Sequence, residues 1–191
     1  MKIKNMTRCA LMASAMTLCA WTAVPVGSLA VSLQTLGLFL TLGLLGGRLG
    51  VVTVAVYLSL GAMGAPVFTG LQGGFGALLG PTGGYLWGFF AAALLWWALE
   101  GRLPRTVTMG LSLLVCYLCG TVWYAWLTAT GLWAAVLVCV LPFVAGDAVK
   151  MVFAGLITSG LKKRGIWRDC PWNWNILRSV RVGCPGFFGE K

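Results

Sequence analysis

Two ionisable side chains lie inside an apolar stretch of the sequence, three residues apart. Asp147 and Lys150 occur in VAGDAVKM, with LWAAVLVCVLPF before this segment and VFAGLITSG after it. Residues three apart in an α-helix lie on the same face. A carboxylate there can accept N–H groups of a ligand, and an ammonium group can bind an anion. The pair therefore fits a small molecule that has a carboxylate and amide-like donors.

The same two residues could instead form an ion pair only with each other. A charge at the centre of a bilayer costs about 2.5–3.5 kcal/mol on insertion scales. A self-contained pair contributes little to stability, because two apolar residues would serve as well or better. Ionisable residues in a membrane segment therefore indicate a binding site by default, with an internal ion pair as the alternative.

Residues for other kinds of chemistry are scarce. The chain has no histidine, which excludes Ser-His and Cys-His catalysis and histidine metal ligands. An intramembrane aspartyl protease needs two membrane aspartates, and Asp147 is the one candidate. Cys116 and Cys119 form a CxxC inside an apolar run, where two small apolar side chains are a simpler interpretation than a redox pair. We expect no enzymatic activity, no cofactor and no metal site.

The elements that position these residues are expected to be membrane helices. Of the 191 residues, 59% are hydrophobic and 9% are charged, and the mean hydropathy is +0.89. A soluble domain of this size needs more polar surface, so a bilayer is the solvent that fits. Lipid permits only helices or closed barrels, and the apolar runs lack the alternation of barrel strands. The sequence therefore predicts an all-α membrane protein.

Six apolar segments have about the length that a transmembrane helix requires, roughly 20 residues. They are expected at 9–26, 29–45, 49–65, 85–99, 106–129 and 132–161. The first segment follows MKIKNMTRC, as in a signal peptide, but we interpret it as a retained transmembrane helix. We expect a six-helix membrane domain at 1–164. A basic, Trp-rich cytoplasmic tail at 165–191 is expected either at the membrane interface or as a disordered extension.

The basic residues predict the orientation of the six segments. They precede the first segment, follow the sixth, and lie between the second and third and between the fourth and fifth: Lys2, Lys4, Arg8, Lys162, Lys163, Arg164, Arg48, Arg102 and Arg105. The other three connections carry no charge. The positive-inside rule therefore places both termini in the cytoplasm, as N-in and C-in, in a multi-pass cell-membrane protein. Helix ends thus explain the net charge of +10, and we expect no nucleic-acid partner.

A glycine-rich loop, VFTGLQGGFGALLGPTGG, joins the third and fourth segments on the outside. A plain linker would be polar and serine-rich, whereas this loop has apolar residues such as Phe68, Phe75 and Leu78. Such a loop is typical of a segment that packs back on the bundle as a lid. A re-entrant loop with a purely structural role is the alternative. The glycines do not form a phosphate-binding P-loop, because its lysine is missing.

Several motifs occur in a recognisable order. GAMGAPVF (61–68) and GGFGALLGPTGGYLWGF (73–89) are accompanied by SLQTL (32–36), GGRLG (46–50) and GDAVK (146–150). Together they resemble the BioY family, the biotin-specific membrane component of energy-coupling-factor (ECF) vitamin transporters. The resemblance covers about residues 8–161, and GPTGGYL is its most specific part. It implies a six-helix substrate-binding unit, an S component, that captures biotin from outside the cell.

The resemblance also implies which residues bind the ligand. In that family an aspartate and a lysine of the last helix contact biotin, and they match Asp147 and Lys150. The loop between the third and fourth helices caps the ligand and contributes an amide side chain. The further candidates from the loop, the fourth segment and the start of the second are Gln72, Tyr85, Gln34 and Thr35. By charge complementarity we expect the biotin carboxylate at Lys150 and the ureido N–H groups at Asp147.

Partner proteins are implied as well: a transmembrane coupling protein and two cytoplasmic ATPases. The chain has no Walker motif, so ATP hydrolysis must come from these partners. Docking in such units uses small residues four apart on the first helix. Ala15, Cys19 and Ala23 keep this spacing, which permits close approach of two helices.

Two further interpretations of the sequence stay open beside biotin uptake. The chain could be an ATPase-independent or ECF-type carrier for another small anionic vitamin. It could also be a structural membrane protein in which Asp147 and Lys150 only pair with each other. Binding of biotin to the purified protein separates these alternatives.

Overall fold

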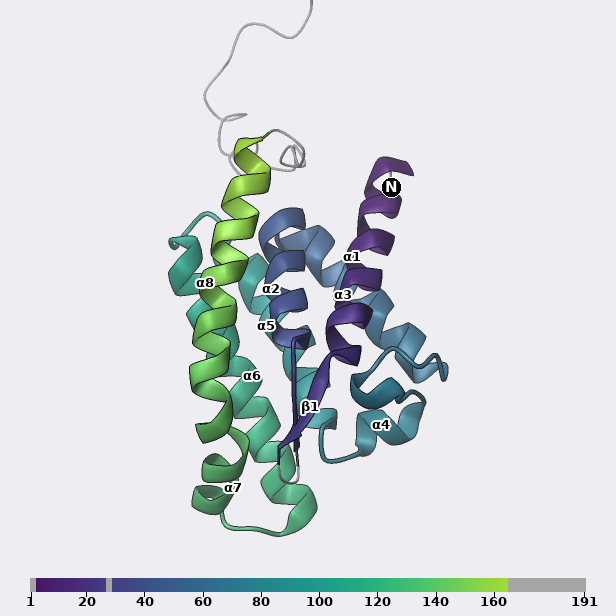
Figure 1. The fold of residues 1–191 in the computed structure, drawn as a ribbon, viewed down its shortest axis with the longest axis vertical. Helices are drawn as coiled ribbons and strands as arrows, with labels where there is room; N and C mark the ends of the chain where they lie inside the picture. The colour runs from purple at the N-terminus through teal and green to yellow at the C-terminus, as the bar shows by residue number, and fades with distance from the viewer. Residues whose placement is uncertain (1–2, 27–28, 165–191) are drawn as a thin grey trace, which may run out of the picture.

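The helical architecture expected from the sequence is confirmed in the computed structural model, which describes residues 3–26 and 29–164. The helices form a bundle, and a β-hairpin points toward its lower end in Figure 1. In chain order the elements are α1 (Ile3–Trp21), β1 (Ala23–Val26), β2 (Leu29–Ser32), α2 (Gln34–Leu45), α3 (Gly47–Ala62), the 3₁₀ turn η1 (Thr69–Leu71), α4 (Phe75–Leu79), α5 (Gly83–Leu99), α6 (Arg105–Thr128), α7 (Leu132–Cys139) and α8 (Leu141–Lys163).

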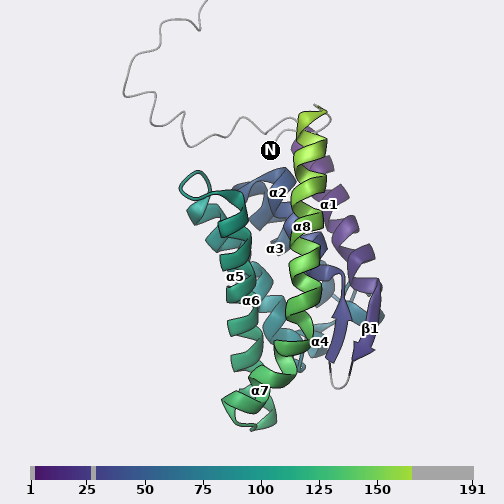
Figure 2. The ribbon, with the colours of Figure 1, turned by 60° about the vertical axis from the view of Figure 1, so that its left-hand side comes forward.

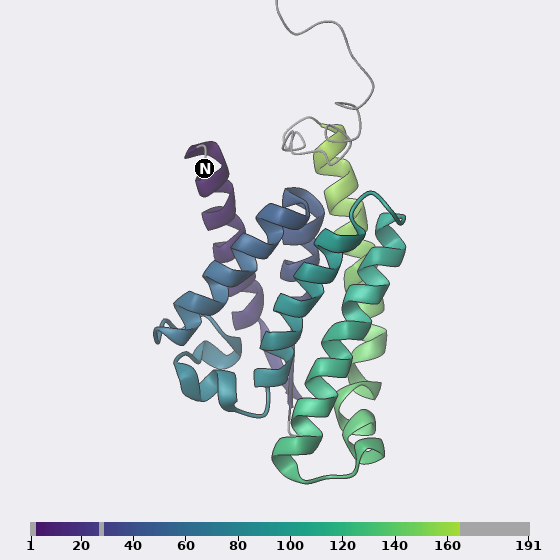
Figure 3. The ribbon, with the colours of Figure 1, turned by 180° about the vertical axis from the view of Figure 1, so that it is seen from behind.

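Connections that carry basic residues lie at one end of the bundle. The start of α1, the α2–α3 junction, the α5–α6 turn and the end of α8 are all at the top in Figures 1 and 3. The hairpin strands, α4 and the α6–α7 turn lie toward the other end. The fold therefore separates the basic connections from the uncharged ones, as the alternation in the sequence predicts.

Helix α2 occupies the centre of the bundle and packs against α1, α3 and α8 (Figure 2). Its apolar residues are buried on several faces, including Leu38, Phe39 and Leu42, which are fully buried. A helix that is apolar all round is the kind that other helices can surround. The first turn of α2 consequently lies inside the molecule, where it can contribute to a site.

The first helix ends earlier than expected and the second begins later, because a hairpin lies between them. Helix α1 ends at Trp21 rather than near residue 26, and α2 begins at Gln34 rather than near residue 29. Strands β1 and β2 pair antiparallel, with Ala23 opposite Ser32. AVPV and LAVS are rich in strand-forming valine, and proline cannot continue a helix. A hydropathy scale detects neither the strand preference of valine nor the helix-breaking effect of proline.

The hairpin also changes the predicted row of small residues, Ala15, Cys19 and Ala23, that was expected to dock a partner. Ala23 lies in β1, so the expectation that it continues the row of Ala15 and Cys19 is wrong. Cys19 is half-buried and packs within the chain, since a Cβ placed on Gly37 of α2 would lie 3.2 Å from the Cys19 Cβ. Close helix approach at Cys19 therefore already serves the α1–α2 contact.

The predicted sixth helix is two helices. A single segment was expected at 132–161, but α7 ends at Cys139 and α8 starts at Leu141. Val140 joins them, and proline follows in the first turn of α8. Proline is favoured there because its missing N–H has no helical partner in the first turn, whereas inside a helix it would remove a hydrogen bond. The break leaves Asp147 and Lys150 together on α8.

One helix in the described part of the chain, α6, is both long and apolar enough to cross a membrane by length and composition. Helices α2, α3 and α5 are apolar but shorter, with 12, 16 and 17 residues.

Glycines allow α5 and α6 to approach closely. A Cβ on Gly88 of α5 would lie 3.1 Å from the Cys116 Cα of α6, and a Cβ on Gly84 would collide with Trp123. From α6, Gly120 faces the ring of Tyr85, and a Cβ added to this glycine would lie 2.6 Å from the ring. Small residues at four-residue spacing are the usual means by which helices in a membrane come into backbone contact.

We expect Gly88→Val to lower the free energy of unfolding by about 1–3 kcal/mol, because the added atoms force α5 and α6 apart. The matched control is Gly110→Val in α6, where an added Cβ meets nothing within 4 Å. Thermal or denaturant unfolding of the purified protein in detergent measures both. Equal stability of the two variants would contradict the close-packing interpretation.

Candidate functional site

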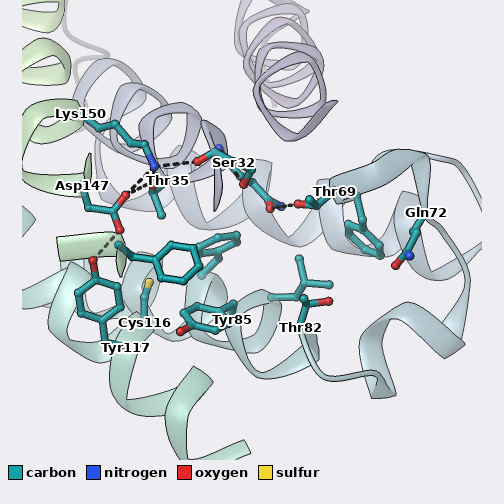
Figure 4. Close-up of a pocket in the computed structure, with 15 residues that line it drawn as sticks. Ser32, Thr35, Thr69, Gln72, Thr82, Tyr85, Cys116, Tyr117, Asp147 and Lys150 are labelled. Atoms are coloured by element: carbon teal, nitrogen blue, oxygen red, sulfur yellow. Dashed lines mark hydrogen bonds and ion pairs between the residues drawn. The ribbon is translucent and has the colours of Figure 1, made fainter. Parts of the chain in front are cut away.

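A cavity lies between the helices and is lined by 15 residues (Figure 4). The lining residues come from β2, the first turn of α2, the glycine-rich loop, α5, α6 and α8. Asp147 and Lys150 lie at one end with the hydroxyl groups of Thr35 and Tyr117, and aromatic side chains form much of the remaining wall. A cavity of this kind, apolar with a few convergent polar groups, is the usual form of a small-molecule site.

The polar end is organised around the carboxylate of Asp147, which is 1% exposed. Its Oδ1 accepts hydrogen bonds from Lys150 Nζ at 2.7 Å and from Thr35 Oγ1 at 2.8 Å. Its Oδ2 accepts one from Tyr117 Oη at 2.6 Å. An ionised carboxylate can accept about four hydrogen bonds, so these three contacts leave room for about one more, on Oδ2.

The ammonium group of Lys150 also makes all of its hydrogen bonds within the protein. Besides Asp147, its ammonium group donates to the main-chain carbonyl oxygen of Ser32 at 2.8 Å and to Thr35 Oγ1 at 3.3 Å. An ammonium group has three hydrogens, and each has an acceptor within the protein. An anionic ligand that binds Lys150 must therefore replace one of these acceptors. The self-pairing expected as an alternative is present, and it extends beyond the pair into a network.

The network brings together four parts of the chain. Asp147 and Lys150 share a face of α8 through their i, i+3 spacing, and Thr35 lies on α2 just after the end of β2. Tyr117 reaches the carboxylate from α6. A buried charge is costly unless it is paired and hydrogen-bonded, which explains why hydroxyl groups and a backbone carbonyl surround the ion pair.

The apolar wall consists mainly of aromatic side chains. Tyr85 and Phe89 project from α5, and Phe143 lies at the start of α8. The rings of Tyr85 and Phe143 pack at a centroid distance of 6.4 Å and an angle of 34°. Aromatic rings packed in this tilted way offer a large apolar contact area. They suit a compact, largely apolar ring system.

The glycine-rich loop closes another part of the cavity. Phe68, Thr69, Gln72 and Thr82 all belong to its lining, so the loop packs back on the bundle rather than extending as a free linker. Phe68 is buried, with 3% of its surface exposed, while Gln72 is exposed at the edge. The prediction that the apolar residues of this loop return to the bundle is confirmed for Phe68 and Leu78, which are both buried. It is wrong for Leu71, Phe75 and Leu79, which are exposed on the outside of the short helical turns of the loop.

Sequence comparison identifies the family to which this arrangement belongs. The model of the BioY family matches residues 1–166. The chain belongs to the BioY family.

Two curated relatives of this BioY-family chain cover most of its length. A protein of Pyrococcus horikoshii named probable biotin transporter BioY is 36% identical over 162 residues, which is 85% of this chain and 98% of the relative. The biotin transporter BioY of Thermotoga maritima is 34% identical over 163 residues, which is 78% of this chain and 90% of the relative.

The fold of the BioY-family chain also matches a solved structure. A crystal structure described as the S-component for biotin from an ECF-type ABC transporter superposes with a TM-score of 0.78 at 26% identity. The match covers 85% of this chain and 92% of the solved one.

The residues proposed from the sequence of this BioY protein all line the cavity: Asp147, Lys150, Gln34, Thr35, Tyr85 and Gln72. They lie in different parts of the cavity. Asp147 and Lys150 form the charged end, and Tyr85 is part of the wall. Gln34 is 4% exposed and has both ends of its amide engaged, by Tyr57 and Thr69. Gln72 stands at the edge (Figure 4).

Sequence reasoning missed Tyr117, Ser32 and Thr69. Tyr117 carried a usable signal, because its phenol lies near the middle of an apolar segment instead of at the interface, where aromatic residues normally gather. Ser32 acts through its backbone carbonyl, for which no residue type is diagnostic. Thr69 had no signal beyond its place in the loop.

We expect Lys150→Met to lower the free energy of unfolding by about 3–5 kcal/mol, because it leaves the buried Asp147 carboxylate without a positive charge beside it. The double variant Asp147→Asn/Lys150→Met should recover much of this loss, since no charge is then buried. Unfolding in detergent measures all three proteins. A double variant that is as unstable as the sum of the single variants would rule out this account.

Proposed function

We propose that the chain takes up biotin as the substrate-binding membrane component of an ECF-type transporter and captures the vitamin from outside the cell. The observation that carries the proposal is the cavity in which Asp147 and Lys150 form a buried charged end beside an aromatic wall. The family and the likeness to a biotin S-component support the choice of ligand. The proposed role is binding and transport, without chemical change of the ligand.

Biotin has polar groups that complement both members of the ion pair at the charged end of the cavity. Its ureido N–H groups are donors, and the Asp147 carboxylate has room for about one further hydrogen bond on Oδ2. Its carboxylate is an anion, for which Lys150 is the cation of the cavity lining. Contact with Lys150 requires exchange with the Ser32 carbonyl or with Thr35, the two acceptors that carry no charge.

The glycine-rich loop is proposed to cap the bound ligand. Four of its residues line the cavity, and Gln72 is the one whose amide lies at the exposed edge. A side chain at that edge can complete contacts with a ligand after it has passed into the cavity. We assign Gln72 this role and Tyr85 a contact with the ring system of biotin.

A placement in the cell membrane with six crossings, N-in and C-in, is proposed for this chain. The crossings are α1, α2, α3, α5, α6 and the α7–α8 pair. The grouping of basic connections at one end of the bundle supports this orientation. The predicted tail at 165–191, including its cysteines Cys170 and Cys184, lies outside the described residues.

The proposed partners are a transmembrane coupling protein and two cytoplasmic ATPases. The sequence has no nucleotide-binding motif, so an energy source must be supplied by other chains. Ala15 on α1 is kept as a candidate for close contact with the coupling protein. It is half-buried on a helix whose outward residues, such as Leu11 and Leu18, are exposed and apolar.

Radiolabelled biotin should bind the purified protein, and Asp147→Asn should weaken binding about 10–100-fold, because hydrogen bonds to a charged group contribute about 1.5–3 kcal/mol. Ser159→Ala, an exposed position on the same helix, is the matched control and should bind normally. Protein that binds no biotin, or that binds another anionic vitamin more tightly, would disprove the function. Unchanged affinity of a folded Asp147→Asn would disprove the site.

The orientation of biotin can be tested with biotin amide, which lacks the carboxylate charge. If the carboxylate contacts Lys150, biotin should bind the wild type about 10-fold or more tightly than its amide. The preference should disappear in Lys150→Met, because the cation that distinguishes the two ligands is gone. A preference that persists in this variant would place the carboxylate elsewhere in the cavity.

A further inference from the structure

The loop segment 67–69 is held from behind, on the side away from the cavity. Phe68 packs edge-on against Tyr57 of α3, with ring centroids 5.6 Å apart at an angle of 75°. Its ring occupies the space that a side chain on Gly61 would need. Phe68 is therefore seated in a recess that the absence of a side chain at Gly61 creates in α3.

A chain of three hydrogen bonds fastens the same segment. Thr69 Oγ1 donates to Gln34 Oε1 at 3.0 Å, and Gln34 Nε2 donates to Tyr57 Oη at 2.7 Å. Tyr57 Oη in turn donates to the Val67 carbonyl oxygen at 2.8 Å. The chain starts and ends in the loop and passes through α2 and α3. Each hydroxyl donates its single hydrogen to one acceptor, and the Gln34 amide donates one of its two hydrogens to Tyr57, so the direction of every bond is consistent.

Tyr57 differs from Gln34 and Thr69 because its side chain does not belong to the cavity lining. Its side chain is fully buried, at 0% exposure. A ligand in the cavity can touch Phe68, Thr69 or Gln34, but the Tyr57 hydroxyl lies behind them. Any influence of this hydroxyl on a ligand must therefore pass through the loop or through Gln34.

We propose that Tyr57 and Gln34 are positioning residues that seat the loop segment 67–69 and thereby set how long the ligand stays bound. The inference rests on the proposed biotin function and identifies what controls release in that site. Displacing the segment from the cavity breaks the hydrogen bonds to Tyr57 and Gln34 and lifts Phe68 out of its recess. Gln34 acts in this role through both ends of its amide, rather than as the primary hydrogen-bonding partner of the ligand.

The decisive variant is Tyr57→Phe, which keeps the ring and removes only the hydroxyl. Tyr57→Phe removes the bond that holds Val67 of the loop and the acceptor of the Gln34 amide. Loss of the bond to Val67 should make dissociation of radiolabelled biotin from protein in lipid nanodiscs about 3–10-fold faster, while association changes less than twofold. Amide hydrogen exchange of residues 67–72 should become faster in the ligand-free protein. Ser59→Ala is the matched control, because its hydroxyl bonds within α3 to Ala55 and does not reach the loop.

A second variant tests the packing side of the anchor from a residue that does not itself line the cavity. Gly61→Ala adds a Cβ where the Phe68 ring lies, and it should also accelerate dissociation and loop exchange. If Tyr57→Phe fails to fold, Gly61→Ala carries the test. Unchanged dissociation in a folded variant would overturn the proposal while biotin binding by the wild type still supports the function. A wild type that does not bind biotin would instead refute the function, and loop exchange would still report whether the anchor exists.

Discussion

Much of the arrangement depends on the burial of one carboxylate. Asp147 is almost fully removed from solvent, and a charge in that position is tolerated only with close partners. Those partners come from α2, α6 and α8, and Lys150 adds the end of β2. The electrostatic requirement of a single residue thus fixes the mutual positions of four elements. The cavity is the space left beside them.

The charged centre could be predicted from sequence because its signal is local. Asp147 and Lys150 stand out in an apolar run, and their spacing alone puts them on one helix face. The rest of the network could not be found in this way. Tyr117 is 30 residues from Asp147, and Ser32 is 118 residues from Lys150. Such contacts depend on how helices pack, and a backbone carbonyl leaves no trace in residue type.

The fold was predictable to a similar extent. Hydropathy located the helical regions and their charged ends, but it measures apolar character and not backbone preference. It therefore extended the first two helices through β1 and β2 and missed the break at Val140. Gln34 shows the same limit at a single residue. An amide near the site suggested a ligand contact, whereas its engagement by Tyr57 and Thr69 depends on where the loop and α3 lie.

All three ammonium hydrogens of Lys150 have acceptors within the protein, and this has a thermodynamic consequence. In an open site, a ligand must strip water from each ion before it can bind, and that dehydration opposes association. Here the ammonium and carboxylate groups have already exchanged water for protein groups during folding, as their burial shows. A ligand then replaces protein acceptors instead of a hydration shell. The enthalpy of recognition should thus reflect exchange between similar hydrogen bonds, leaving the apolar wall to supply most of the favourable free energy.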